Sequence, residues 1–173
     1  FEDREVGGFF YTAAGHEQLI SRPKDVQDSS VPSGNSMAAT LLLRLGKLSG
    51  RGEYLAAAER TLKAFASLLE KHPAAAGQML IALDFYLGPT RELIVVGDAE
   101  PAAEIMRQIY RGYLPNRVLA RRPGAGHSAA LDGAFRGKTA IDGQPTLYVC
   151  QDFVCQQPVA GREPIRRALN DLA

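Results

Sequence analysis

Glu92-Leu93-Ile94-Val95-Val96-Gly97 is the stretch that decides the fold of the second half of the chain. Its apolar residues form an unbroken run between turn residues, which is typical of a strand buried on both faces. Asp98 can cap a following helix, along which Ile105 and Ile109 recur at helical spacing. Residues 117–120 are expected to form the next strand. The order of strand, helix and strand predicts a βαβ unit.

Two more elements are predicted toward the C-terminus. Thr146–Cys150 is expected to be a third strand, and Pro164–Leu172 a short closing helix. Residues 121–144 are rich in glycine and are expected to form a loop. A loop of this length is uncommon in a compact domain, which counts against that assignment.

The first half of the chain has helical periodicity. The predicted elements are a short aromatic strand at 6–12 and helices at 35–48, 53–69 and 73–86. In the first helix Met37, Leu41, Leu45 and Leu48 recur at helical spacing. The short connections between the helices favour antiparallel neighbours. We therefore expect a helical domain at 1–88 and a small α/β domain at 89–173.

Composition excludes several classes of protein. The chain has 173 residues with 46% hydrophobic and 23% charged residues, which is ordinary for a globular protein. The net charge of +1 gives no electrostatic case for nucleic acid. No apolar run approaches the roughly 20 residues that a membrane-spanning helix requires. The chain begins at Phe1 without an initiator methionine, so we expect it to continue from an upstream segment.

The densest polar stretch is the loop at residues 22–36, which ends at a predicted helix N-terminus. Such an end offers free backbone N–H groups and partial positive charge. Together with cationic and polar side chains it could bind a polyhydroxylated or phosphorylated ligand. The candidate ligand-binding residues are Arg22, Lys24, Asp28, Ser33 and Asn35. The same residue types also serve as caps and braces in turns, so a purely structural role remains the alternative.

Asp28 and Asp25 are the candidates for general acid or base chemistry in this loop, because that role requires a carboxylate or a histidine. We expect the helix N–H groups, with Arg22 or Lys24, to lower the pKa of Asp28. Gly34 is expected where a Cβ would crowd a ligand or a neighbouring loop. Whether the chain is an enzyme stays open at this point.

The two cysteines, Cys150 and Cys155, are expected to be reduced thiols, one ending a strand and the other just past a turn. A reversible disulfide and a metal site are the alternatives. Thioredoxin-type chemistry uses two intervening residues rather than four, and zinc requires four ligands. No metal and no cofactor are expected. The apparently unpaired thiols favour the cytoplasm.

Four stretches resemble one known family. They are Gly7-Gly8-Phe9-Phe10-Tyr11-Thr12, Leu19-Ile20-Ser21-Arg22-Pro23-Lys24-Asp25, Asp28-Ser29-Ser30-Val31-Pro32-Ser33-Gly34-Asn35-Ser36-Met37-Ala38-Ala39, and Leu147-Tyr148-Val149-Cys150-Gln151-Asp152-Phe153-Val154-Cys155-Gln156-Gln157-Pro158. The sequence resembles the C-terminal part of the thioredoxin-domain-containing spermatogenesis-associated protein 20 family. Ser29-Ser30 departs slightly from the pattern expected there. The family's thioredoxin-like domain and its Cys-x-x-Cys are absent from this chain.

The resemblance implies a mainly α fold: a fragment of an (α/α)6 toroid, similar to N-acylglucosamine 2-epimerases, followed by a small α/β segment. It implies that the polar loop lines a central funnel and takes part in binding or processing carbohydrate, with a sugar or sugar phosphate as ligand. The alternative is a non-catalytic interaction or scaffold module that accompanies a thioredoxin-like domain. Either way, the implied partner is the remainder of the same protein.

Overall fold

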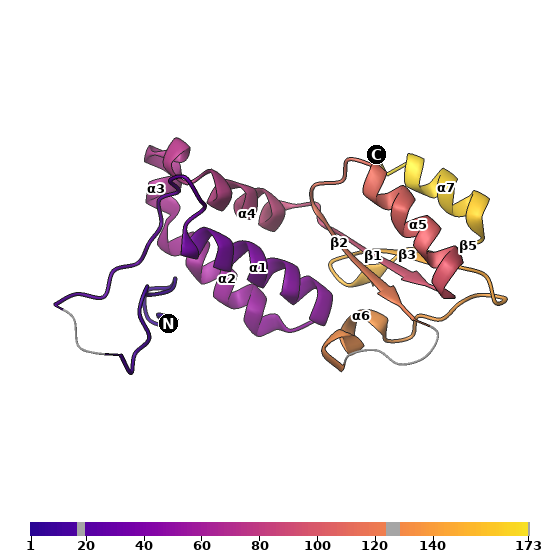
Figure 1. Ribbon diagram of the computed structural model, residues 1–173, viewed down its shortest axis with the longest axis horizontal. Helices are drawn as coiled ribbons and strands as arrows, with labels where there is room; N and C mark the ends of the chain where they lie inside the picture. The colour runs from indigo at the N-terminus through magenta and orange to yellow at the C-terminus, as the bar shows by residue number, and fades with distance from the viewer. Residues whose placement is uncertain (17–19, 124–128, 173) are drawn as a thin grey trace. The chain divides into compact units, whose positions relative to one another are not determined.

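The computed structural model describes residues 1–16, 20–123 and 129–172. The chain divides into two compact units (Figure 1). The first unit comprises Phe1–Gly46 and Arg51–Gly88, and the second comprises Lys47–Gly50 and Pro89–Ala173.

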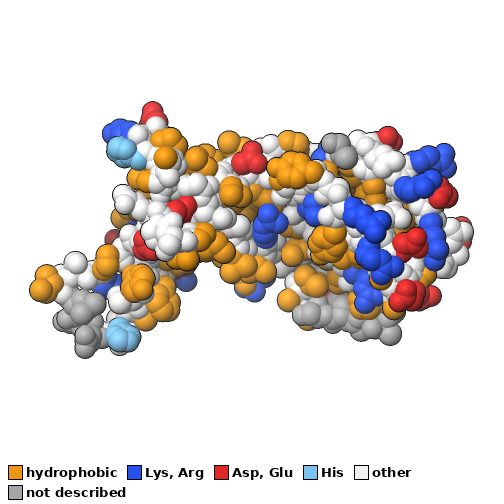
Figure 2. Space-filling model, turned by 45° about the horizontal axis from the view of Figure 1, so that its top comes forward, with side chains coloured by type: hydrophobic (Ala, Val, Ile, Leu, Met, Phe, Trp, Pro, Cys, Tyr) orange, Lys and Arg blue, Asp and Glu red, His pale blue; other side chains and the backbone are white. Residues whose placement is uncertain are grey.

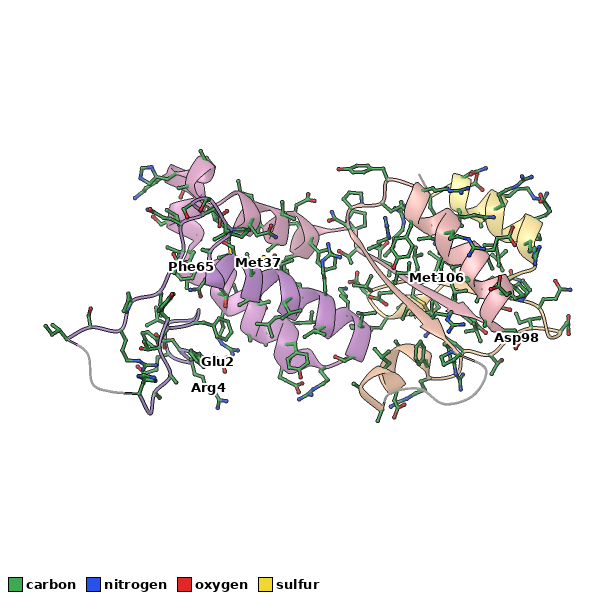
Figure 3. The ribbon with its side chains drawn as sticks, viewed as in Figure 1. Glu2, Arg4, Met37, Phe65, Asp98 and Met106 are labelled. Carbon is green, nitrogen blue, oxygen red and sulfur yellow. A yellow bond between two sulfur atoms is a disulfide. The ribbon has the colours of Figure 1, made fainter. Side chains whose placement is uncertain are left out.

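Helices dominate the first unit. They are α1 (Gly34–Ser49), α2 (Gly52–Ala64), α3 (Ala66–Lys71), the 3₁₀ turn η1 (Pro73–Ala75) and α4 (Gly77–Leu87). The single helix expected at 53–69 is broken at Phe65, which lies between α2 and α3 (Figure 3). The backbone of Phe65 is not helical, with φ of −108° and ψ of 11°. The helix expected from Pro73 begins instead with a 3₁₀ turn and becomes α-helical at Gly77. The chain therefore changes direction more often than the periodicity indicates.

The buried face of α1 is not its leucine stripe. Its buried residues are Asn35, Ser36, Ala39, Leu43 and Gly46. Met37, Leu41 and Leu45, which lie one turn apart, are 48%, 56% and 39% exposed. An amphipathic helix normally buries its apolar stripe. In α1 a stripe of three large apolar side chains is left uncovered.

The N-terminal segment packs on α2 as irregular backbone. The strand expected at 6–12 is wrong, because this segment forms only an isolated bridge between Glu2 and Phe9. Gly7 and Gly8 have φ values of +96° and +79°, a region that favours glycine. A Cβ on Gly7 would lie 2.5 Å from the backbone oxygen of Arg60, so only glycine allows this approach.

A mixed five-stranded sheet forms the centre of the second unit. Its strands are β1 (Arg91–Val96), β2 (Arg117–Arg122), β3 (Thr146–Gln151), β4 (Val154–Cys155) and β5 (Val159–Ala160). The order is β2-β1-β3-β4, and β5 also pairs with β3. The β1 and β2 strands are parallel and are joined through α5 (Ala99–Arg111), which confirms the predicted βαβ unit. The β3 strand runs antiparallel to β1.

The sheet has a core on each face. Leu93 and Val95 point to the face covered by α5 and by α7 (Arg162–Asn170). Ile94 and Val96 point to the opposite face, where Phe135 of α6 (Asp132–Phe135) packs. Figure 1 shows α5 and α7 together on one side of the sheet and α6 on the other. This three-layer arrangement explains the continuous apolar run of β1, since both faces are buried.

The expected toroid fragment is wrong, whereas the expected predominance of helix is roughly consistent with the structure. The first unit is helical, the second is an α/β unit built around the mixed sheet, and the helices in the described ranges form no part of a ring of hairpins. A toroid requires regular helix pairs that repeat around a ring. Here the break at Phe65 and the 3₁₀ turn before α4 interrupt any such regular pairing. Helical periodicity alone specifies which side of a helix is apolar, and it does not specify a ring.

Candidate functional site

Asn35 lies at the start of α1 and holds the N-terminal segment in place. It is only 2% exposed. Its Oδ1 accepts a hydrogen bond from the Phe9 N–H at 2.7 Å, and its Nδ2 donates to the Phe9 carbonyl at 2.9 Å. The same Nδ2 donates to the Asp25 carbonyl at 2.7 Å. The Asn35 amide thus bonds both backbone groups of Phe9, as a neighbouring strand would. All three of these hydrogen bonds go to backbone groups.

Asp28 joins the starts of two helices. Its Oδ1 accepts from the Ser33 N–H at 2.8 Å, just before α1, and its Oδ2 accepts from the Gln78 N–H at 2.8 Å, in the first turn of α4. Burial raises the pKa of this carboxyl, but hydrogen bonds from Ser33, Gln78 and Ser36 outweigh it and hold the pKa below its ordinary value. The expected direction is confirmed. The expected cations are not among the causes.

The remaining loop residues also bind protein groups. Lys24 donates to Asp3 Oδ2 at 2.7 Å and to the Gly7 carbonyl at 2.6 Å. Arg22 donates to the Thr12 carbonyl at 2.8 Å and lies over the Phe10 ring at 4.1 Å. Ser33 is buried, and its hydroxyl pairs with that of Ser36 at 2.7 Å.

Asp25 contributes its carbonyl to Asn35, while the residue itself is exposed. Gly34 does not play the expected part, because a Cβ there would meet nothing within 4 Å. The loop of residues 22–36 therefore forms one network that braces the N-terminal segment, α1 and α4. The side chains of Asp28 and Asn35 make hydrogen bonds with backbone groups of the protein.

The second unit holds a different cluster, which sequence reasoning missed. Glu92 on β1 is 5% exposed, and its carboxylate lies 3.5 Å from Lys47 Nζ. The Phe153 N–H donates to Glu92 Oε2 at 3.2 Å. Burial raises the pKa of Glu92, and the charge of Lys47 partly offsets this. Burial also lowers the pKa of Lys138, an effect that Glu92 opposes.

A disulfide joins Cys150 to Cys155 beside this carboxyl. The expectation of two reduced thiols is therefore wrong, and so is the support that it lent to a cytoplasmic location. Cys150 lies opposite Glu92 in the β1–β3 register and opposite Cys155 in the β3–β4 register. The antiparallel pairing of β3 with β4 brings the two Cα atoms within 3.9 Å, a closeness that four intervening residues do not reveal.

A tight hairpin produces this pairing. Asp152 and Phe153 connect β3 to β4, with φ values of 50° and 64°. Positive φ at both central residues is the geometry of a two-residue hairpin turn. The turn places the Phe153 N–H on Glu92 and the Asp152 carboxylate 2.7 Å from Lys47 Nζ.

The side chains of this cluster surround a small cavity of about 50 Å³. Its lining comes from both lysines, the acidic residue, both cysteines and their apolar neighbours: Lys47, Glu92, Ile94, Gly133, Ala134, Lys138, Cys150, Phe153 and Cys155. The sequence contained one signal of this cluster. Glu92 is a charged residue at the start of the apolar run that forms β1, and a buried charge requires a partner.

An apolar groove of about 370 Å³ lies in the first unit between α2, α3 and α4. Its lining includes four leucines and several polar neighbours: Leu62, Leu69, Leu80, Leu83, Glu59, Lys63 and Tyr86. Figure 2 shows hydrophobic side chains gathered at the surface of this unit. The groove and the leucine stripe of α1 leave apolar area of the first unit uncovered.

No family model matches the chain. Comparison with curated proteins does identify relatives. Spermatogenesis-associated protein 20 of Homo sapiens is 28% identical over 176 residues, and that of Rattus norvegicus is 27% identical over 175 residues. Each alignment covers 98% of this chain and 22% of the relative. The chain is homologous to a part of these proteins and spans 22% of their length. No solved structure matches.

No helix in the described part of the chain is both long enough and apolar enough to cross a membrane. Across residues 1–16, 20–123 and 129–172, no group of three or more His, Cys, Asp or Glu side chains is placed to hold a metal ion.

Proposed function

We propose that the chain is an interaction module near the C-terminus of a longer protein, and that its first unit docks against the remainder of that protein. The observation that carries this is the reversed burial of α1, in which Met37, Leu41 and Leu45 are exposed. Exposed apolar side chains in such a row mark contact surfaces. The occupant is the rest of the same chain, because the homologous proteins extend far beyond the 22% that this segment spans.

The polar loop supports the same proposal. The bonds made by Asp28 and Asn35 go to backbone groups of the first unit. A carbohydrate site needs such groups to be free for ligand hydroxyls. In this proposal the loop holds α1 and α4 in place, and so supports the docking surface. The resemblance adds that the partner segment includes a thioredoxin-like domain.

Side-chain footprinting tests the docking. We expect Met37, Leu41 and Leu45 to be labelled in this chain alone and protected several-fold in the longer protein. Tyr113 in the second unit is 84% exposed and serves as an internal control, with labelling that stays the same. Equal labelling of the α1 stripe in both forms would contradict the proposal.

Ligand binding tests the carbohydrate alternative. The longer protein is screened against sugars and sugar phosphates, and any binding is remeasured in Asp28→Asn. The proposal predicts no binding that depends on Asp28. A sugar whose affinity collapses in Asp28→Asn, while the fold stays intact, would restore the loop as a ligand site.

A further inference from the structure

We propose that the Cys150–Cys155 disulfide is a thiol–disulfide exchange site, whose partner is a dithiol or a disulfide of another protein segment. Glu92 gives and takes the proton in this exchange. The proposal rests on the pairing of a buried with an exposed cysteine, and on the charged cavity that both cysteines line.

The two cysteines are unequal. Cys150 is 2% exposed on the central strand β3, while Cys155 is exposed on the edge strand β4. Exchange requires a thiolate to approach one sulfur in line with the bond that breaks, so access decides which sulfur is attacked. Here the incoming thiolate reaches Cys155 Sγ, and Cys150 Sγ is the leaving group.

The leaving group faces the acidic side chain. Glu92 lies directly opposite Cys150 in the β1–β3 register, so both side chains point to the same face of the sheet. Lys47 and Lys138 line the same cavity. Their positive charges stabilise a thiolate on Cys150 and a carboxylate on Glu92.

The exchange takes place in two successive attacks. A partner thiolate attacks Cys155 Sγ, the bond between Cys155 and Cys150 breaks, and the electron pair leaves on Cys150. Protonated Glu92 gives its proton to that thiolate. The partner's second thiolate then attacks its own sulfur in the mixed disulfide and releases Cys155 as a thiolate, which takes a proton from water. The partner leaves oxidised, and this chain holds a reduced pair. In the reverse direction the Glu92 carboxylate takes the proton from Cys150.

Several charged groups face Glu92 and set the pH dependence of the exchange. They are Lys47, Asp152 in the hairpin turn, and Lys138. The raised pKa of Glu92 brings it closer to that of a thiol, which improves proton transfer between them.

Glutathione serves as the probe, with thiols counted by alkylation and mass shift. We expect reduced glutathione to open the disulfide while circular dichroism shows that the chain stays folded. In Cys150→Ser the lone Cys155 thiolate should attack oxidised glutathione and accumulate as a mixed disulfide, with one reduced glutathione released. Cys155→Ser should form its adduct at least about tenfold more slowly, because Cys150 is buried. A disulfide that stays closed in a large excess of glutathione, or equal adduct rates at the two cysteines, would overturn the proposal.

A second pair of variants isolates Glu92. Glu92→Gln keeps the shape and should slow exchange by about tenfold or more at neutral pH. Glu104→Gln, a carboxylate of α5 paired with Arg162, is the matched control and should react as wild type. An unchanged rate in Glu92→Gln would refute the proton role. If that variant does not fold, the wild-type pH–rate profile decides: a profile that follows the ionisation of glutathione alone refutes it equally.

Discussion

Asn35 is the residue on which the N-terminal segment of the first unit depends. Its amide satisfies both backbone groups of Phe9 and the carbonyl of Asp25. No backbone ladder replaces these bonds, because the segment forms only one isolated bridge in the described ranges. The Asn35 side chain thus makes the hydrogen bonds to Phe9 that the backbone of a neighbouring strand would otherwise make.

Asn35→Ala should destabilise the first unit by about 3 kcal/mol, because three hydrogen bonds are lost and buried backbone groups are left unsatisfied. The measurement is amide hydrogen exchange resolved to the first unit during urea unfolding. Gln27→Ala, an exposed amide in the same loop, is the control and should leave stability unchanged. A change below about 1 kcal/mol in Asn35→Ala would contradict the bracing role of the amide.

Glu92 should make the stability of the second unit depend on pH. Its pKa is higher in the folded chain than the unfolded value of about 4.3, so the folded state holds the proton to higher pH. The free energy of unfolding should therefore fall as pH rises from the unfolded pKa through the raised folded pKa. In Glu92→Gln this slope should disappear. Urea unfolding between pH 4 and 8 measures both, with the disulfide kept intact. An equal slope in the variant would show that Lys47 cancels the effect of burial.

At the scale of elements, glycine positions decide how the N-terminal segment meets α2. Gly7 has a positive φ, and a Cβ there would collide with the Arg60 carbonyl of α2. Gly34 opens α1 and has open space around it. The glycine in the polar loop that the sequence singled out is thus replaceable, whereas Gly7 is not.

Gly7→Ala should destabilise the first unit by about 1–3 kcal/mol, from the strained φ and the close contact. Gly34→Ala should be neutral or stabilising by up to about 1 kcal/mol, because alanine lowers the entropy of the unfolded chain. Thermal unfolding followed by circular dichroism compares the two. Equal melting temperatures for the two variants would show that the segment does not pack on α2 in solution.

At the scale of the whole molecule, the uncovered apolar surface determines behaviour in isolation. The α1 stripe and the groove between α2, α3 and α4 both remain open in the chain. Isolated apolar surface of this kind promotes self-association.

We expect the chain alone to self-associate as its concentration rises, and Leu41→Gln to weaken this association. Sedimentation velocity over a range of concentrations measures it. Val154→Gln, which removes an exposed apolar side chain of the second unit, is the matched control and should behave as wild type. A wild-type chain that remains monomeric at every concentration would show that the remainder of the protein is not needed to cover α1.

Local patterns in the sequence were enough to predict most elements of the second unit. The apolar run of β1, the helical period of α5 and the strands β2 and β3 follow from nearest neighbours along the chain, because burial on both faces requires continuous apolar residues. The loop of residues 22–36 was also recognised as special. Its residue types serve caps and ligands equally well, so its role stayed open.

Only the tertiary structure decided the rest. Periodicity marked the leucine stripe of α1, but packing against Phe9 and the neighbouring loop buried the side that carries Asn35 and Ser36. The spacing of Cys150 and Cys155 was interpreted as two reduced thiols. The turn at Asp152 and Phe153 sets the β3–β4 register that places the two cysteines opposite each other, where they form the disulfide. Glu92 gained its partners from segments far away in sequence. Such contacts depend on register and burial between distant segments, and the pattern within a segment does not encode them.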